Sequence, residues 1–234
     1  MRRTILGVSL AAVALATALG ASAASPSKGG AFVGYSLAES TGTTCPGSAA
    51  CSNIAAEPAI RADGAGRFFG SSENGLGGGT VAFRSTDGGL HYTTLASPNA
   101  VSQTNKTGFA PGGGDTDLAG APDPNPATGS YNVYVASLSL ANVDISVSTD
   151  GGQTWTLNPI TTPETVDDRE WIAADGSFGY CFSYHDAPQG ITVGCGKTVG
   201  STGVVATPQF ASALDADHAF QIGENEIGNL AIDP

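Results

Sequence analysis

The stretch Ser148-Thr149-Asp150-Gly151-Gly152-Gln153-Thr154-Trp155-Thr156 decides the fold of this chain, because it occurs twice. The earlier copy is Ser85-Thr86-Asp87-Gly88-Gly89-Leu90-His91-Tyr92-Thr93, and both copies follow a short alternating apolar run. Ser and Asp side chains bond nearby backbone N–H groups and glycine tolerates positive φ, so each stretch predicts a tight hairpin turn. The aromatic residue then returns on the outgoing strand, where it can be buried. A specific turn used twice indicates repeated β units.

Strand patterns recur around these turns in a constant order. The first round predicts strands at 57–63, 67–72, 80–84 and 91–95. The second round predicts strands at 117–123, 132–138, 143–147 and 155–157. The third predicts strands at 169–175, 177–184 and 191–195, with a degenerate turn at 198–203, and a fourth round opens at 227–233.

The spacing of the rounds favours one architecture. Matching aspartates stand at 63, 123, 175 and 233, which are 60, 52 and 58 residues apart. Four strands per period of this length predict an all-β fold, a β-propeller of four-stranded antiparallel blades, over residues 57–234. We expect blades at about 57–97, 115–158 and 168–210 and the start of another at 225–234, so the propeller is expected to be incomplete. A stack of two-sheet sandwiches is the structural alternative.

Residues 1–24 have the three parts of a secretory signal peptide. Arg2 and Arg3 form a basic region, Ile5–Leu19 is apolar, and Ala21-Ser22-Ala23 is a small-residue cleavage signal. We therefore expect cleavage after Ala23 or Ala24 and a secreted protein. An uncleaved anchor helix is the alternative, although the apolar run is short for a bilayer. We expect no other segment to span a membrane.

Four cysteines fit an exported protein with two disulfides, for which three pairings exist. Local pairing, Cys45 with Cys51 and Cys181 with Cys195, is the favoured interpretation. The second pair would lie on adjacent strands of a hairpin turning near Pro188, because the two cysteines are symmetric about that position. Residues 25–56 are expected to be an N-terminal segment with the first disulfide loop and one strand at Ala31–Leu37.

The excess of acidic residues indicates which kinds of molecule the protein can bind. The chain has 9 basic and 21 acidic residues, and loss of Arg2 and Arg3 would take its net charge from −12 to −14. Phosphate binding needs basic clusters, so we expect no nucleic-acid partner. Acidic surfaces attract cations, and Ca²⁺ is the possible cofactor. The alternative is that the charge only keeps the protein soluble.

The second turn matches the pattern Ser-x-Asp-x-Gly-x-Thr-Trp and resembles the Asp-box, or BNR repeat, of sialidases and related secreted bacterial propellers. The runs Asp168–Asp175, Tyr184–Asp186 and Gly112–Leu118 resemble the same proteins. The resemblance covers about residues 30–234, and the first copy departs from it at His91 and Tyr92. The structural residues of the two Asp-boxes would be Ser85, Asp87, Gly89, Ser148, Asp150, Gly152 and Trp155.

This resemblance implies a secreted sialidase-like propeller that acts on or binds extracellular glycans. If it is an enzyme, it would be an exo-acting glycoside hydrolase. A non-catalytic extracellular recognition or scaffold module is the alternative. Sialidases hold the substrate carboxylate with three arginines, whereas the chain after residue 24 has only Arg61, Arg67, Arg84 and Arg169, and it lacks the Phe-Arg-Ile-Pro motif of the first arginine.

Blade topology predicts where the candidate site lies. In a four-stranded antiparallel blade, the turns between strands 1–2 and 3–4 share one end, and the remaining connections share the other. The repeated turns are 3–4 turns, so the acidic clusters should gather at the opposite end. Candidate catalytic residues there are Asp168, Arg169 and Glu170, and candidate substrate-binding residues are Arg61, Asp115, Asp117, His185 and Asp186. The alternative is that these carboxylates cap loops and bridge blades.

An open propeller would also leave strand edges without a neighbour. Exposed strand edges favour pairing with another polypeptide. We therefore expect the open edge of the propeller to associate with another chain.

Overall fold

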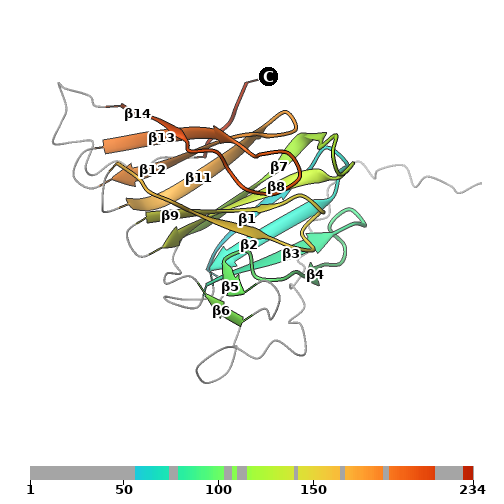
Figure 1. Cartoon of the computed structure of the whole chain (residues 1–234). Coiled ribbons are helices and arrows are strands. Elements are labelled where there is room, and N and C mark those ends of the chain that lie inside the picture. The colour runs from blue at the N-terminus through green and yellow to red at the C-terminus, as the bar shows by residue number, and fades with distance from the viewer. Residues whose placement is uncertain are drawn as a thin grey trace, which may run out of the picture. The chain divides into compact units, whose positions relative to one another are not determined.

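The computed structural model describes residues 56–73, 79–102, 107–109, 115–139, 142–163, 167–186, 190–213 and 229–233 (Figure 1). All of them belong to the second of two compact units, Tyr35–Pro234, which alone is described below. The expected signal peptide, the strand at Ala31–Leu37 and the Cys45–Cys51 pair lie outside the described residues.

The described residues form antiparallel strands and turns, without a helix. Three four-stranded sheets follow one another along the chain, and in each the strands are neighbours in sequence order. The first contains β1 (Ala56–Ala62), β2 (Phe68–Glu73), β3 (Thr80–Ser85) and β4 (Thr93–Thr94). The second contains β7 (Thr116–Pro124), β8 (Tyr131–Ser139), β9 (Asn142–Ser148) and β10 (Thr156–Ile160). The third contains β11 (Asp167–Asp175), β12 (Gly179–Asp186), β13 (Gly190–Lys197) and β14 (Gln209–Ala213).

The all-β class and the three rounds of antiparallel strands are thus confirmed, and the sheets are open. Three details differ from expectation. Strand β4 has two residues, because the N–H of His91 donates to Asp87 Oδ1 at 3.0 Å and keeps His91 in the turn. A hairpin of β5 (Ala100–Ser102) and β6 (Thr107–Phe109) precedes the second sheet. Residues 229–233 form no strand and pair with no described strand; the contact that Asn229 makes with β1 is a side-chain hydrogen bond from Arg61.

Both copies of the repeated stretch form a tight turn with the same hydrogen bonds. The hydroxyl of Ser148 donates to Asp150 Oδ1 at 2.7 Å and accepts the N–H of Gly152 at 2.7 Å. Ser85 makes the matching bonds to Asp87 at 2.8 Å and from Gly89 at 2.9 Å. Gly152 has φ of 88° and Gly89 has φ of 87°, the left-handed region that favours glycine. Serine, aspartate and glycine at this spacing therefore determine the turn.

We expect Ser148→Ala to lower the free energy of unfolding by about 1–2 kcal/mol, because a fully buried residue loses the hydroxyl that bonds Asp150 Oδ1 and the N–H groups of Asp150 and Gly152. Urea denaturation would measure the change. Thr86→Ala, at an exposed position of the first turn, is the control and should have little effect. Equal stability of Ser148→Ala and the wild type would show that the turn does not depend on this hydroxyl.

Trp155, which ends the second turn, is buried between the first and second sheets. It belongs to a cluster with Phe69 of the first sheet and Leu118, Val133 and Val135 of the second. A separate cluster joins the second and third sheets and contains a row of stacked rings. The centroids of Tyr134 and Tyr180 are 5.4 Å apart, those of Tyr180 and Phe182 6.3 Å, and those of Phe182 and Tyr184 5.9 Å. Each sheet is therefore packed on the next through its own apolar cluster.

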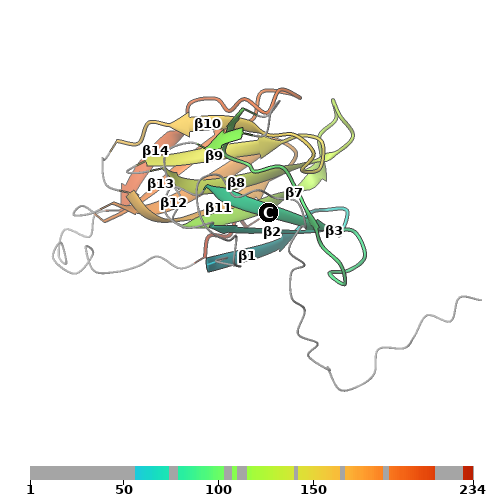
Figure 2. The same cartoon turned by 90° about the horizontal axis from the view of Figure 1, so that it is seen from below.

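The first strands of the three sheets, β1, β7 and β11, lie next to one another (Figures 1 and 2). Gly64 N–H donates to the carbonyl of Ala121 at 3.1 Å, and a Cβ on Gly120 would lie 2.8 Å from the Cα of Asp63. Only glycine permits that approach. Gly64 belongs to the turn between β1 and β2. At the same end of the sheets, Arg84 Nη1 at the end of β3 donates to the carbonyl of Gly151, in the turn between β9 and β10, at 2.8 Å. The turns between strands 1–2 and 3–4 therefore meet at one end, and the candidate residues lie at the other.

The predicted pairing of Cys181 with Cys195 is confirmed. These residues are opposite one another on β12 and β13, with Cα atoms 4.1 Å apart. The β12–β13 pairing extends to Asp186 and Gly190, as expected from the symmetry of the two cysteines in the sequence.

Candidate functional site

A cavity of about 420 Å³ lies where β1, β7 and β11 come together at the end opposite the repeated turns. Its lining includes Arg61, Asp115, Arg169, Glu170, Trp171 and Asn229. Four of these residues were candidates from the sequence. Asp115 and Arg169 are 54 positions apart in the chain and meet here through a hydrogen bond.

Asp117 on β7 follows the lining residue Thr116 and contacts both of the other first strands, β1 and β11. Its buried carboxylate accepts the N–H of Ile172 on β11 at 3.0 Å. Arg61 on β1 approaches the same carboxylate at 3.3 Å and also donates to Asn229 Oδ1 at 2.7 Å. Burial raises the pKa of Asp117, while the Ile172 amide and Arg61 act in the opposite direction. The Arg61–Asp117 pair therefore fixes one wall of the cavity and leaves the guanidinium partly exposed.

Within the described part of the chain, Arg169 is the only residue other than glycine that has a positive φ, at 54°. It sits in an irregularity of the β11–β12 ladder between Asp168 and Trp171. Its N–H donates to Asp115 Oδ2 at 3.1 Å and to Asp168 Oδ1 at 3.0 Å, and its guanidinium lies 3.6 Å from Asp115. A left-handed conformation costs an L-residue about 1–2 kcal/mol. The two carboxylates hold Arg169 in this conformation, and such strain is concentrated at functional sites.

Glu170 is a buried carboxyl group in the lining of the cavity, only 2 % exposed. Neither carboxyl oxygen makes a hydrogen bond within the described residues. The nearby N–H of Leu138 donates instead to the carbonyl of Asp115 at 3.1 Å. Burial raises the pKa of Glu170 well above its usual value, the charges of Asp115 and Asp168 raise it further, and the backbone N–H groups of Glu170 and Leu138 act in the opposite direction. This carboxyl group therefore holds its proton more tightly than a solvent-exposed glutamate does.

Asp168 and His185 lie beside the cavity, opposite one another on β11 and β12. Burial raises the pKa of Asp168, as do its hydrogen bond with Asp115 and the charge of Asp115. The hydrogen bond from the Arg169 N–H and, after it, the charge of His185 lower that pKa. Asp186 is paired with Asp167 through the backbone, and its side chain lies outside the described residues. The structure thus brings Asp115, Asp168, Arg169 and Glu170 together, with Asp117 and Arg61 adjoining.

Six residues of the lining were not candidates from the sequence, namely Pro58, Ala59, Ile60, Thr116, Trp171 and Asn229. Trp171 follows the alternating pattern that predicts a core position, yet it is half-buried and lines the cavity. The irregularity before it disturbs the alternation, and that signal is invisible in the sequence. Asn229 comes from a segment expected to be a strand, and it reaches the cavity through its bond to Arg61.

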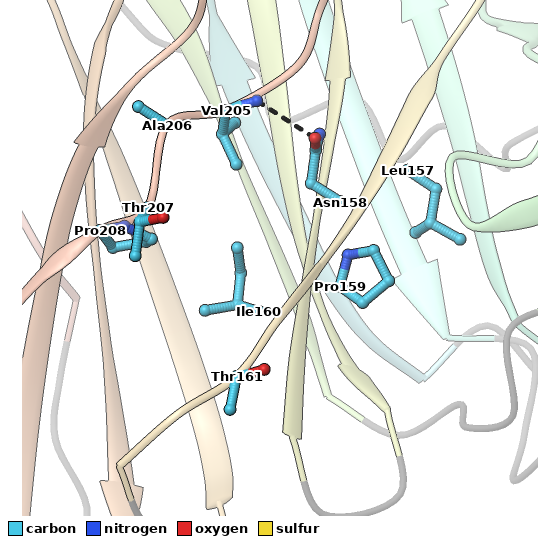
Figure 3. Close-up of a pocket in the computed structure, with 9 residues that line it drawn as sticks. All are labelled: Leu157, Asn158, Pro159, Ile160, Thr161, Val205, Ala206, Thr207 and Pro208. Carbon is cyan, nitrogen blue, oxygen red and sulfur yellow. Dashed lines mark hydrogen bonds between the residues drawn. The ribbon is translucent and has the colours of Figure 1, made fainter.

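A second cavity, of about 300 Å³, lies between β10 and residues 205–208 (Figure 3). Asn158 accepts the N–H of Val205 at 3.1 Å and donates to the carbonyls of Ile145 and Gly203 at 3.0 Å each. The lining of this second cavity contains no acidic, basic or histidine side chain. The first cavity, whose lining includes Arg61, Asp115, Arg169, Glu170, Trp171 and Asn229, is therefore the candidate site and is named the Arg61–Glu170 cavity.

The described residues contain no group of three or more His, Cys, Asp or Glu side chains arranged to hold a metal ion. Within the same ranges, no helical segment has the length and apolarity needed to cross a bilayer. The Cys181–Cys195 disulfide is consistent with an extracellular protein.

No family model matches the sequence, and no curated protein sequence matches it. Solved structures give distant all-β neighbours. One is a protein of unknown function from Dyadobacter fermentans, with 16 % identity and a TM-score of 0.39 over 65 % of this chain and 49 % of that one. Another is a mutant of the NanB sialidase from Streptococcus pneumoniae, with 12 % identity and a TM-score of 0.42 over 63 % of this chain and 22 % of that one. The chain thus matches about half of the first neighbour and about a fifth of the second.

Proposed function

We propose that this chain is a secreted, sialidase-like propeller protein that binds extracellular glycans in the Arg61–Glu170 cavity. The observation that carries the proposal is the composition of the cavity. Its lining combines carboxyl, guanidinium and amide groups with one indole ring. Sugars present many hydroxyl groups that both donate and accept hydrogen bonds, together with a less polar face of C–H groups. A concave site with a few fixed polar groups and an aromatic surface suits such a ligand.

Under this proposal the three sheets are propeller blades, and the repeated turns are Asp-boxes at the end away from the ligand. The blades are residues 57–97, 115–158 and 168–210, and the next would begin at 225–234. Residues 1–24 would direct secretion, and Cys45–Cys51 would form a second disulfide in residues 25–56. The order of strands and turns in the three sheets supports this assignment.

A second candidate function is glycoside hydrolysis of the exo-acting kind. Glycosidases pair a protonated carboxylic acid with a carboxylate. Glu170, whose pKa is raised by burial, would act as the acid, and Asp168 or Asp115, both bonded to the N–H of Arg169, would supply the carboxylate. Glu170→Gln separates the two functions, because it should abolish hydrolysis while glycan binding persists. Binding by the wild type without release of any sugar would favour a non-catalytic recognition module.

Trp171→Ala should weaken glycan binding about tenfold, because it removes the aromatic surface of the cavity. A glycan array followed by titration calorimetry with the best-bound oligosaccharide would measure the change. Tyr92→Ala, an aromatic truncation in the first repeated turn, is the matched control and should leave the affinity unchanged. Equal affinities of wild type and Trp171→Ala would rule out binding against this indole.

A further inference from the structure

We propose that the Arg61–Glu170 cavity selects uncharged glycans and rejects sialylated and other anionic ones. This inference rests on the proposed function and names its ligand class. It differs from what resemblance to sialidases implies, because those enzymes hold an acidic sugar.

The first line of support is the state of the arginines. Arg61 is bound to Asp117 and Asn229, and Arg169 is bound to Asp115. Arg67 is held by Asp63, with Nε 2.7 Å and Nη2 2.6 Å from Oδ2, and Arg84 donates to a carbonyl of the second repeated turn. These four are all the arginines after residue 24. Arg67 and Arg84 lie at the end of the sheets away from the cavity. The charges of Arg61 and Arg169 are already neutralised by carboxylates.

The second line of support is the negative potential around the cavity. Asp115 contributes to the raised pKa values of Glu73, Asp168 and Glu170, in each case after burial, so its charge reaches three neighbouring carboxyl groups. The chain as a whole has a net charge of −12. A ligand carboxylate would therefore meet repulsion both on approach and inside the cavity. Unfavourable charge of this kind excludes a competing ligand class.

The third line of support is Glu170, which lacks a hydrogen-bond partner within the described residues and lines the cavity. A buried polar group without a partner is costly, and a ligand that supplies one recovers that cost. A neutral hydroxyl can donate to or accept from the Glu170 carboxyl. Asp115 and Asn229 add further polar atoms, and Trp171 adds an apolar surface. The cavity thus offers hydrogen bonds for hydroxyl groups without offering an available cation.

The test uses pairs of oligosaccharides that differ only in a terminal sialic acid, lactose and sialyllactose among them, on an array and by titration calorimetry. We expect the neutral member of a bound pair to bind at least about tenfold more tightly. Equal or tighter binding of the sialylated member would overturn the charge selectivity and leave the glycan-binding function standing. Failure of every glycan to bind would reject the proposed function and this inference together.

A charge-removing variant provides the matched comparison. Asp115→Asn should improve binding of the sialylated member relative to the neutral one by about fivefold or more, because it releases Arg169 and removes a central negative charge. Asp168→Asn should act in the same direction and serves if Asp115→Asn does not fold. Asp123→Asn, an exposed carboxylate near the opposite end of β7, should leave the ratio unchanged. An unchanged ratio in both site variants would contradict the electrostatic explanation.

Discussion

Trp155→Ala should lower the free energy of unfolding by about 3–5 kcal/mol, the cost of truncating a large buried aromatic side chain. Trp155 is 4 % exposed and packs with residues of two different sheets, so the cavity left behind would lie in the contact between them. The indole Nε1 has no hydrogen-bond partner within the described residues. The predicted loss therefore comes from packing, and urea denaturation would measure it.

The chain contains two tryptophans, which supply an internal control. Trp171→Ala makes the same chemical change at a half-buried residue that lines a cavity, so it should cost much less stability. Trp155→Phe should also cost less than Trp155→Ala, because most of the ring volume remains. A loss below about 1 kcal/mol for Trp155→Ala would contradict the role of this ring in joining the two sheets.

The second large effect depends on pH and comes from Asp144 on β9. Burial raises the pKa of Asp144 to about 6 from 3.8, although a hydrogen bond with Ser139 acts in the opposite direction. The folded protein therefore binds this proton more tightly than the unfolded chain does. Stability should fall as the pH rises from about 4 to about 7, by up to about 3 kcal/mol from this group. Glu170 contributes with the same sign, because its pKa is also raised.

Asp144→Asn removes the ionisable group and keeps a side chain of similar shape. We expect the variant to be more stable than wild type by about 1–3 kcal/mol near pH 8 and about equally stable near pH 3.5. Urea denaturation at both pH values would show the difference. Asp123→Asn, at an exposed position, should change neither value appreciably. A loss of stability at both pH values would show that the Asp144 carboxyl makes a favourable native interaction.

Local chemistry explains why most strands were predictable. The Ser-Asp-Gly turns have their own hydrogen bonds, and alternating residues on either side set the strand faces, so few distant contacts are needed. The fourth strand of the third sheet was harder to locate. Its preceding turn has lost the repeated pattern, and a bridge between Thr198 and Val205 extends the connection before β14 begins.

The sequence predicts which residues gather at the candidate site. It does not predict the backbone conformation that arranges them. Blade topology placed Asp115, Arg169 and Glu170 at one end, and the structure has them lining one cavity. The left-handed conformation of Arg169 and the shift in the β11–β12 ladder depend on contacts with Asp115, 54 positions earlier. The periodicity of the sequence does not reveal a contact between residues so far apart in the chain.

Each four-stranded sheet is built from one continuous stretch of chain, with every strand paired to its neighbour in sequence. Strand pairing within a sheet therefore closes only short loops, which is favourable for the rate of folding. A chain that emerges from its N-terminus can complete one sheet before the next is available. The sheets then couple mainly through the clusters on their faces, so damage to one should reach its immediate neighbour first, as in repeat proteins.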